Sequence, residues 1–396
     1  MFSPHFDEFF KGDSDHWEAI DWICSECITK ICEMSGFIFS NFPVIDIIVT
    51  YMKTICRIFG KPYTLSNIVP LFETCMRDTG ASYLRDIPPI CSPLVVIFLC
   101  GVLANFDGEE QVMKLITFIK QCLLTISTQG LSMEYLIYAI TVLCRNETKQ
   151  YALMQMLRET LVYPVSEVRI ATSEILGVLV KSVSKEVLSM QVAPAIITLS
   201  TDNDMNVVIA AVPSLGCVME SIKDKNVLDK ATLQLQSILD DPECRKHIPL
   251  LKIIIKTFTK ILPNLDARLR DEFFLPQLKM VAEYEHSITD VNDRLEIAEE
   301  LISAYSATLC CFLSKDIVIA LIIPALKHLE SELKEISPET MDIVVLLLKD
   351  AETKIDDDKN STGSGSSSTS TSTSKLFGGL SSRFDKFKKK KDMEMS

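Results

Sequence analysis

Two stretches of the chain repeat each other and decide its fold. They are Tyr163-Pro-Val-Ser-Glu-Val-Arg-Ile-Ala-Thr-Ser-Glu-Ile-Leu-Gly177 and Asp202-Asn-Asp-Met-Asn-Val-Val-Ile-Ala-Ala-Val-Pro-Ser-Leu-Gly216. Val168, Ala171, Leu176 and Gly177 all recur 39 residues later. Apolar residues separated by three or four positions predict helices with one buried face. A period of about 40 residues is typical of stacked helical hairpins, and small residues such as Ala and Gly allow neighbouring helices to approach closely.

The composition of the whole chain fits a helical fold and excludes several others. With 47% hydrophobic residues among 396, the chain can bury a large core and is not intrinsically disordered. Only 13 glycines are present, and four of them (Gly363, Gly365, Gly378 and Gly379) lie near the C-terminus. The others are too few for sheet folds with many tight turns or for glycine-rich nucleotide-binding loops.

A proline motif marks further copies of the repeat. A proline between apolar residues occurs at Val69-Pro70, Ala193-Pro194, Leu275-Pro276 and Ile323-Pro324. The first two gaps, of 124 and 82 residues, correspond to three and two periods of about 41 residues. Because proline is tolerated in the first turn of a helix, we expect each motif to open a helix.

This pattern resembles HEAT repeats, in which each unit is a helical hairpin and an Asp turn leads into a Val-Arg-x-Ala helix. The resemblance implies an all-α, HEAT-type α-solenoid of stacked hairpins, about eight of them between residues 15 and 355. Arg169 matches the arginine of the family, whereas Val208 replaces it one repeat later, so we expect no continuous arginine ladder. Pro213 lies inside a helix and removes one backbone hydrogen bond, so we expect a kink there.

Four regions differ in composition. Residues 1–14 form a polar and aromatic leader, and residues 15–355 form the predicted HEAT-repeat solenoid. Residues 356–374 begin with three aspartates and continue as a Ser/Thr run, a composition that predicts a flexible linker. Residues 375–396 form a basic tail with a net charge of +4, which leaves -17 for the rest of the chain. We expect the C-terminal tail to be disordered.

Charge and cysteine content restrict the partners and the compartment. The chain has 40 basic and 53 acidic side chains, and its net charge of -13 repels phosphates, so we expect no nucleic acid partner. Most of the 13 cysteines lie in apolar runs, where a thiol behaves as a small hydrophobic group. The first residues carry acidic groups where a signal peptide carries basic ones. We therefore expect a cytoplasmic protein with reduced cysteines.

No motif predicts catalysis, a metal or a cofactor. Cys24, Cys27 and Cys32 have the spacing of a partial metal site, but no second cysteine pair or histidine pair supplies the remaining ligands. The five histidines are isolated in the sequence, and no nucleophile elbow or phosphate-binding loop occurs. We expect no catalytic, cofactor-binding or metal-binding residues, and no enzyme activity.

An uncharged run covers residues 87–106 and would be long enough to span a bilayer if it were wholly helical. Pro88, Pro89 and Pro93 restrict a continuous helix to roughly its last 13 residues. That length is typical of a helix buried in a solenoid core, so we expect no membrane span here.

The basic tail carries the candidate membrane-binding residues. Phe377, Leu380, Phe384 and Phe387 are spaced by three, four and three positions, which places them on one helical face. The cations that follow them are Lys388, Lys389, Lys390 and Lys391. Such a segment can bind an anionic membrane surface weakly and reversibly. Two alternatives stay open at this point, a solvated tail without a partner and a nuclear-import signal.

Several segments resemble one particular family more closely than HEAT repeats in general. They resemble the C-terminal HEAT region of the RELCH family, which are Rab-binding proteins with LisH, coiled-coil and HEAT segments. The resemblance covers roughly residues 15–355 and is strongest after residue 160. No LisH motif or heptad stretch is present, so the chain corresponds to the last part of such a protein. The segments include Val192-Ala-Pro-Ala-Ile-Ile-Thr-Leu-Ser200, Arg270-Asp-Glu-Phe-Phe-Leu-Pro276, Arg294-Leu-Glu-Ile-Ala298 and Ala304-Tyr-Ser-Ala-Thr-Leu-Cys310.

The resemblance implies a non-catalytic trafficking adaptor. RELCH proteins tether recycling endosomes to the trans-Golgi network by binding a Rab GTPase of recycling endosomes and oxysterol-binding protein, which supports intracellular cholesterol transport. The resemblance therefore implies these two partners and a peripheral location on these membranes. A regulatory scaffold subunit of a Ser/Thr protein phosphatase is the main alternative, because such subunits are also acidic HEAT solenoids. A nuclear transport adaptor is a third interpretation.

Overall fold

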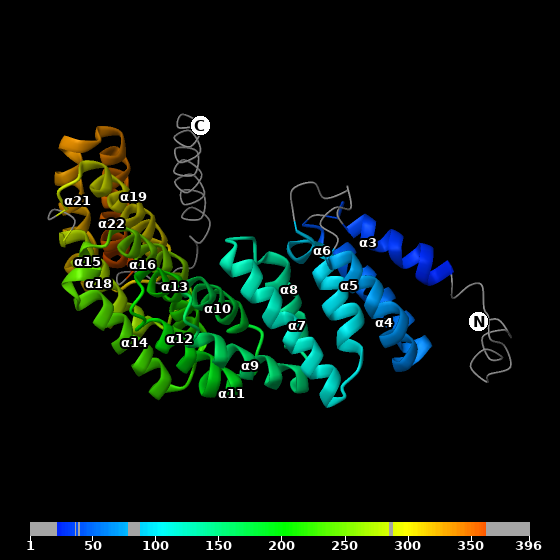
Figure 1. Cartoon of the computed structure of the whole chain (residues 1–396). Helices are drawn as coiled ribbons and strands as arrows, with labels where there is room; N and C mark the ends of the chain where they lie inside the picture. Colours follow the sequence, from blue (N-terminus) through cyan, green and yellow to red (C-terminus); the bar gives the residue numbers. More distant parts are fainter. Residues whose placement is uncertain (1–21, 36, 39, 78–87, 285–287, 362–396) are drawn as a thin grey trace, which may run out of the picture. The chain divides into compact units, whose positions relative to one another are not determined.

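The computed structural model describes residues 22–35, 37–38, 40–77, 88–284 and 288–361, without the side chains of residues 24, 25, 77 and 356–361. Helices follow one another through these residues, and no strand occurs among them (Figure 1). The all-α fold predicted from the repeat is therefore confirmed. The predicted leader, residues 1–14, and the predicted tail, residues 375–396, lie outside the described residues.

The chain divides into two units, residues 1–214 and 215–396. Within the first unit, successive helices pair into hairpins, and the label η marks turns of π or 3-10 geometry. Its helices are η1 (Ile23–Ile28), α3 (Thr29–Ser35), α4 (Phe42–Tyr63), η2 (Thr64–Ile68), α5 (Val69–Arg77), η3 (Pro89–Cys91), α6 (Pro93–Val96), η4 (Ile97–Val102), η5 (Leu103–Asn105), α7 (Glu109–Thr128), α8 (Glu134–Leu143), α9 (Glu147–Leu161), α10 (Ser166–Leu179), α11 (Lys185–Val187), η6 (Leu188–Val192) and α12 (Ala193–Leu199).

The boundary between the units falls inside α13 (Met205–Ser221). The second unit continues the pattern of hairpins. Its helices are α14 (Lys225–Asp240), α15 (Pro242–Lys246), α16 (Ile248–Ile261), η7 (Leu262–Asn264), α17 (Ala267–Leu269), η8 (Arg270–Phe274), α18 (Leu275–Tyr284), α19 (Val291–Leu309), α20 (Lys315–Ile317), η10 (Val318–Ile322), α21 (Ile323–Ile336) and α22 (Pro338–Ser361).

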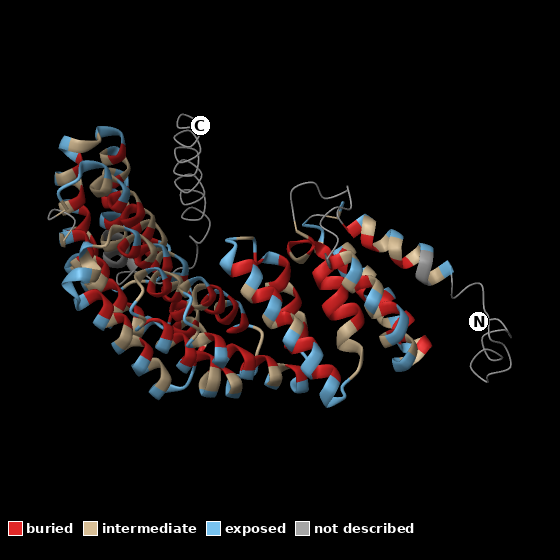
Figure 2. Cartoon of the chain, viewed as in Figure 1, coloured by how far each residue is buried: buried red, intermediate tan, exposed pale blue. Residues whose placement is uncertain are grey.

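Each helix buries one face against its neighbours. Buried residues form stripes along the helices in Figure 2, on the sides where helices meet. In α16, Leu250, Ile254, Phe258 and Ile261 are all buried, at the spacing that the sequence predicted. Full burial of one such side chain stabilises the fold by about 1.5–3 kcal/mol. Stability therefore comes from contacts between successive hairpins, as in other repeat proteins.

Each proline motif lies in the first turn of an α-helix, as expected, but a π-helical turn leads into that α-helix without a break. Each motif follows a π-helical turn that begins six residues before the proline, namely η2, η6, η8 and η10. Proline lacks an N–H group and its ring clashes with the carbonyl four residues earlier. A wider π turn removes that clash, so the helix continues through the motif. The recurrence of the motif still marks the repeat.

The uncharged run folds as predicted. A continuous helical stretch runs from Pro93 to Asn105, through α6, η4 and η5, and residues 93–102 are buried. Its length of 13 residues agrees with the limit that the prolines impose. Among the described residues, no helix is both long enough and apolar enough to cross a membrane.

Three features differ from the expectations or extend them. Gly60 has φ 77° and ψ 173°, a conformation open to glycine, and it kinks α4. α13 continues through Pro213 without a break. The kink of the helix axis that we expect at Pro213 stays a prediction. The last helix, α22, reaches Ser361 and so includes the first six residues of the expected linker, 356–361. No glycine or proline stops it before Gly363.

Candidate interaction surface

Polar contacts join neighbouring hairpins at intervals of one repeat. In the first unit, Lys120 Nζ lies 2.6 Å from Glu159 Oε2, 39 residues along the chain. In the second unit, Gln277 Nε2 donates a 2.6 Å hydrogen bond to Gln236 Oε1, 41 residues away. These separations match the period predicted from sequence, so equivalent positions of successive hairpins lie side by side.

Arg169 connects two consecutive repeats. Its Nε and Nη2 donate hydrogen bonds of 2.7 and 2.9 Å to the two carboxylate oxygens of Asp202. Its Nη1 donates to the carbonyl oxygens of Tyr163, at 2.7 Å, and Pro164, at 3.1 Å. The hydrogen bonds from Arg169 lower the pKa of Asp202, and the carboxylate raises the pKa of Arg169. With side chains 16% and 13% exposed, this pair is a structural contact and not a binding site.

Gly177 and Gly216 are positions of close helix contact, as the sequence predicted. A Cβ atom on Gly177 would lie 2.3 Å from Ser214 Oγ and 3.1 Å from Ser214 Cβ. A Cβ atom on Gly216 would lie 2.4 Å from Thr257 Cγ2. Each glycine thus meets the second helix of the following hairpin, which requires the smallest side chain at that position.

Ion pairs fix the register of α16 and α19 in the second unit. Lys252 pairs with Glu296 at 2.5 Å, and Lys256 pairs with Glu300 at 3.6 Å. Lys256 lies four residues after Lys252 on α16, and Glu300 lies four residues after Glu296 on α19. The two helices therefore run side by side in one register. Because the charges compensate each other, this surface carries little net charge for a ligand.

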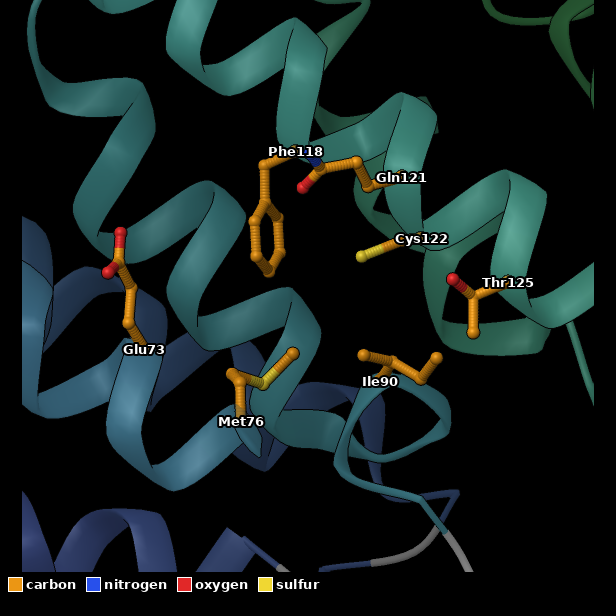
Figure 3. Close-up of a pocket in the computed structure, with 7 residues that line it drawn as sticks. All are labelled: Glu73, Met76, Ile90, Phe118, Gln121, Cys122 and Thr125. Atoms are coloured by element: carbon orange, nitrogen blue, oxygen red, sulfur yellow. The ribbon is translucent and has the colours of Figure 1, made fainter. Parts of the chain in front are cut away.

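A pocket in the first unit lies between α5, η3 and α7 (Figure 3). Its volume is about 290 Å³, near the lower end for small-ligand sites. Phe118 forms one wall, and its ring packs edge-on against the buried Phe98 at 5.1 Å between centroids. The lining residues are Glu73, Met76, Ile90, Phe118, Gln121, Cys122 and Thr125.

The pocket can hold an apolar group but has no reactive one. Met76, Ile90 and Phe118 give it apolar walls, while Glu73 and Gln121 give it a polar rim. Burial raises the pKa of the Cys122 thiol to about 12, so this thiol stays protonated at neutral pH and is a poor nucleophile. The pocket therefore binds by shape and apolar contact.

Three other buried thiols show the same behaviour. Burial raises the pKa of Cys56 to about 11 and the pKa values of Cys100 and Cys144 to about 12. Cys27 Sγ lies 3.6 Å from Tyr51 Oη, and the side chain of Cys24 is not described. In the part of the chain with described side chains, no three metal-binding groups lie together.

The predicted membrane-binding residues, from Phe377 to Lys391, lie outside the described residues. Sequence reasoning missed a different surface, at the first hairpin. Five large apolar side chains of this hairpin are exposed, and they are Trp22, Met34, Phe37, Ile47 and Tyr51. In the sequence these residues look like core positions, because only the stacking shows which helix faces have no neighbour.

The described hairpins and the contacts between them define the class of this protein as a helical-repeat protein. A family model described as the RAB11-binding protein RELCH C-terminal domain matches residues 91–350. The chain belongs to this family, and the resemblance seen in the sequence is confirmed.

Curated relatives agree with the family. The chain is 29% identical over 343 residues to the RAB11-binding protein RELCH homolog of Danio rerio, and 28% identical to RAB11-binding protein RELCH of Mus musculus and of Homo sapiens. Each alignment covers 86% of this chain but only 28–29% of the relative. The chain thus spans less than a third of the length of these relatives.

Two solved structures share helical architecture with the chain at low similarity. Cex1p matches with a TM-score of 0.41 and 14% identity, over 80% of this chain and 54% of that one. Importin beta matches with a TM-score of 0.42 and 13% identity, over 86% of this chain and 49% of that one. At these scores the fold assignment rests on the hairpins of the chain itself.

Proposed function

We propose that this chain is a non-catalytic trafficking adaptor that binds a Rab GTPase of the RAB11 kind. One observation carries the proposal, the alignment of 86% of the chain with relatives that are named RAB11-binding proteins. The fold supports it, because stacked hairpins present extended surfaces for partner proteins.

The finer parts of the proposal rest on membership of the RELCH family. The second partner is oxysterol-binding protein, and the site of action is the contact between recycling endosomes and the trans-Golgi network. The chain is then cytoplasmic and peripheral on these membranes, and it supports cholesterol transfer between them. The tail, residues 375–396, adds weak contact with anionic lipid.

Capture with purified components tests the proposal. The whole chain is immobilised and exposed to RAB11 loaded with a GTP analogue or with GDP, and a Rab of another compartment serves as the control. We expect RAB11 to be retained in the GTP state and the control Rab to be lost. Retention of neither Rab, together with capture of a purified phosphatase catalytic subunit, would replace the adaptor by the scaffold interpretation.

A further inference from the structure

The exposed side of α4 has an apolar edge. Ile47 and Tyr51 lie four residues apart on this helix and are 69% and 43% exposed. Tyr51 Oη lies 3.6 Å from Cys27 Sγ, which places the apolar edge beside η1. These residues are therefore next to the point where the described chain begins, at Trp22.

The other edge of the exposed side is basic. Lys53 and Arg57 also lie four residues apart, and Lys61 follows just after the kink at Gly60. None of these three cations forms an ion pair within the described part of the chain. The carboxylate on this edge, Asp46, is engaged by the hydroxyl of Tyr138, which lies 2.8 Å from both of its oxygens.

We call these residues together the α4 surface: Ile47, Tyr51, Lys53, Arg57 and Lys61. An apolar edge beside cations that form no ion pair, on a chain of net charge -13, selects for an acidic and apolar occupant, although Lys61 also feels the charge of Glu110.

We propose that residues 1–21 of this chain bind the α4 surface. The segment contains six acidic residues and one lysine, for a net charge of -5. It also contains five aromatic residues, Phe2, Phe6, Phe9, Phe10 and Trp17. Its acidic groups complement the basic edge, and its aromatic rings fit the apolar edge. The C-terminal tail has the wrong sign of charge for this site.

Length and attachment allow this contact. The segment joins η1 directly, and η1 already touches Tyr51. Twenty-one extended residues reach about 70 Å, whereas α4 up to the kink is about 27 Å long. Because the segment is tethered beside its site, even weak intrinsic binding gives high occupancy.

Amide hydrogen exchange of the whole chain tests the proposal. The test variant is Lys53→Glu combined with Arg57→Glu, and the matched control is Lys185→Glu, an exposed lysine on α11 of the same unit. We expect measurable protection of residues 1–21 in the wild type and the control. The double variant should lose this protection by about tenfold, with the protection of α4 itself unchanged. High salt should reduce the protection in the wild type, because the Debye length falls to about 3 Å at 1 M.

A charge exchange makes the test specific. In the wild-type background, Asp13→Lys combined with Asp15→Lys should abolish the protection of residues 1–21. In the Lys53→Glu, Arg57→Glu background, the same two changes should restore it. Absence of protection in the wild type, or protection that survives the double variant, would overturn the proposal. Protection that grows with protein concentration would also overturn it, because a second copy would then cover the surface.

Discussion

The contact between Arg169 and Asp202 gives the sharpest prediction about stability. Arg169→Met removes two hydrogen bonds to the carboxylate and two to backbone carbonyls, and leaves Asp202 13% exposed without its cation. Loss of one partner of a buried pair costs about 3–5 kcal/mol, and the partial exposure here places the expected loss near 3 kcal/mol. Arg169→Lys keeps the charge but not the two-pronged geometry, so it should lose part of this stability.

A double-mutant cycle isolates the pairwise part of this loss. Arg169→Met, Asp202→Asn and the double variant are compared by urea unfolding, with hydrogen exchange in α10 as the local readout, since long repeat arrays need not unfold in two states. We expect a coupling of about 2 kcal/mol between the two side chains. The matched control is the fully exposed pair Lys246 and Glu243, where the coupling should be much smaller. Equal couplings in the two cycles would refute the reasoning.

The same pair has a predicted pH dependence. The pKa of Asp202 is lowered in the folded state, so folding favours its charged form. The stabilisation from the pair is fully present above the ordinary Asp pKa of about 3.9 and is lost as the pH falls through the lowered value. The wild type should therefore lose more stability below about pH 4 than Arg169→Met does. An equal loss of stability with falling pH in the two proteins would contradict this.

Three further predictions concern other regions. Gly177→Ala should lower the stability by about 1–3 kcal/mol in thermal unfolding, although alanine favours helices, because its Cβ would meet Ser214. Adding Ser214→Gly should restore most of this loss. An unchanged or raised melting temperature for Gly177→Ala would contradict the close contact. Alkylation at pH 8 followed by mass spectrometry should label the exposed Cys310 well before the buried Cys122, whose pKa is about 12, and equal rates would show that the pocket opens readily. Replacing Phe384 and Phe387 by serine should reduce flotation with anionic vesicles, whereas equal flotation would mean that the tail makes no membrane contact.

The repeat could be predicted from the sequence because its markers are local. Val168, Ala171 and Gly177 recur one period later, and the structure places Gly177 against the next hairpin as their small size implies. The buried helix from Pro93 to Asn105 was predictable for the same reason, since prolines set its start and apolar residues fill it. Membership of the RELCH family could also be predicted from the sequence, because longer segments such as Arg270–Pro276 resemble that family.

Other features depend on contacts that local patterns do not contain. The π turn η6, which leads into α12 just before Pro194, is one such feature, because the apolar pattern around the proline does not distinguish it from an α-helical turn. The pocket is formed by Met76, Ile90 and Phe118, which come from three elements and meet only through stacking. The α4 surface was missed because Ile47 and Tyr51 have the spacing of core residues.

The binding of RAB11 tests the central claim most directly. Isothermal titration of the whole chain with RAB11, in the GTP-analogue state and in the GDP state, gives two dissociation constants under one set of conditions. The account predicts measurable affinity for the GTP state and affinity at least about tenfold weaker for the GDP state, a difference of about 1.4 kcal/mol. Equal affinity in both states, or no heat of binding in either, would contradict the account.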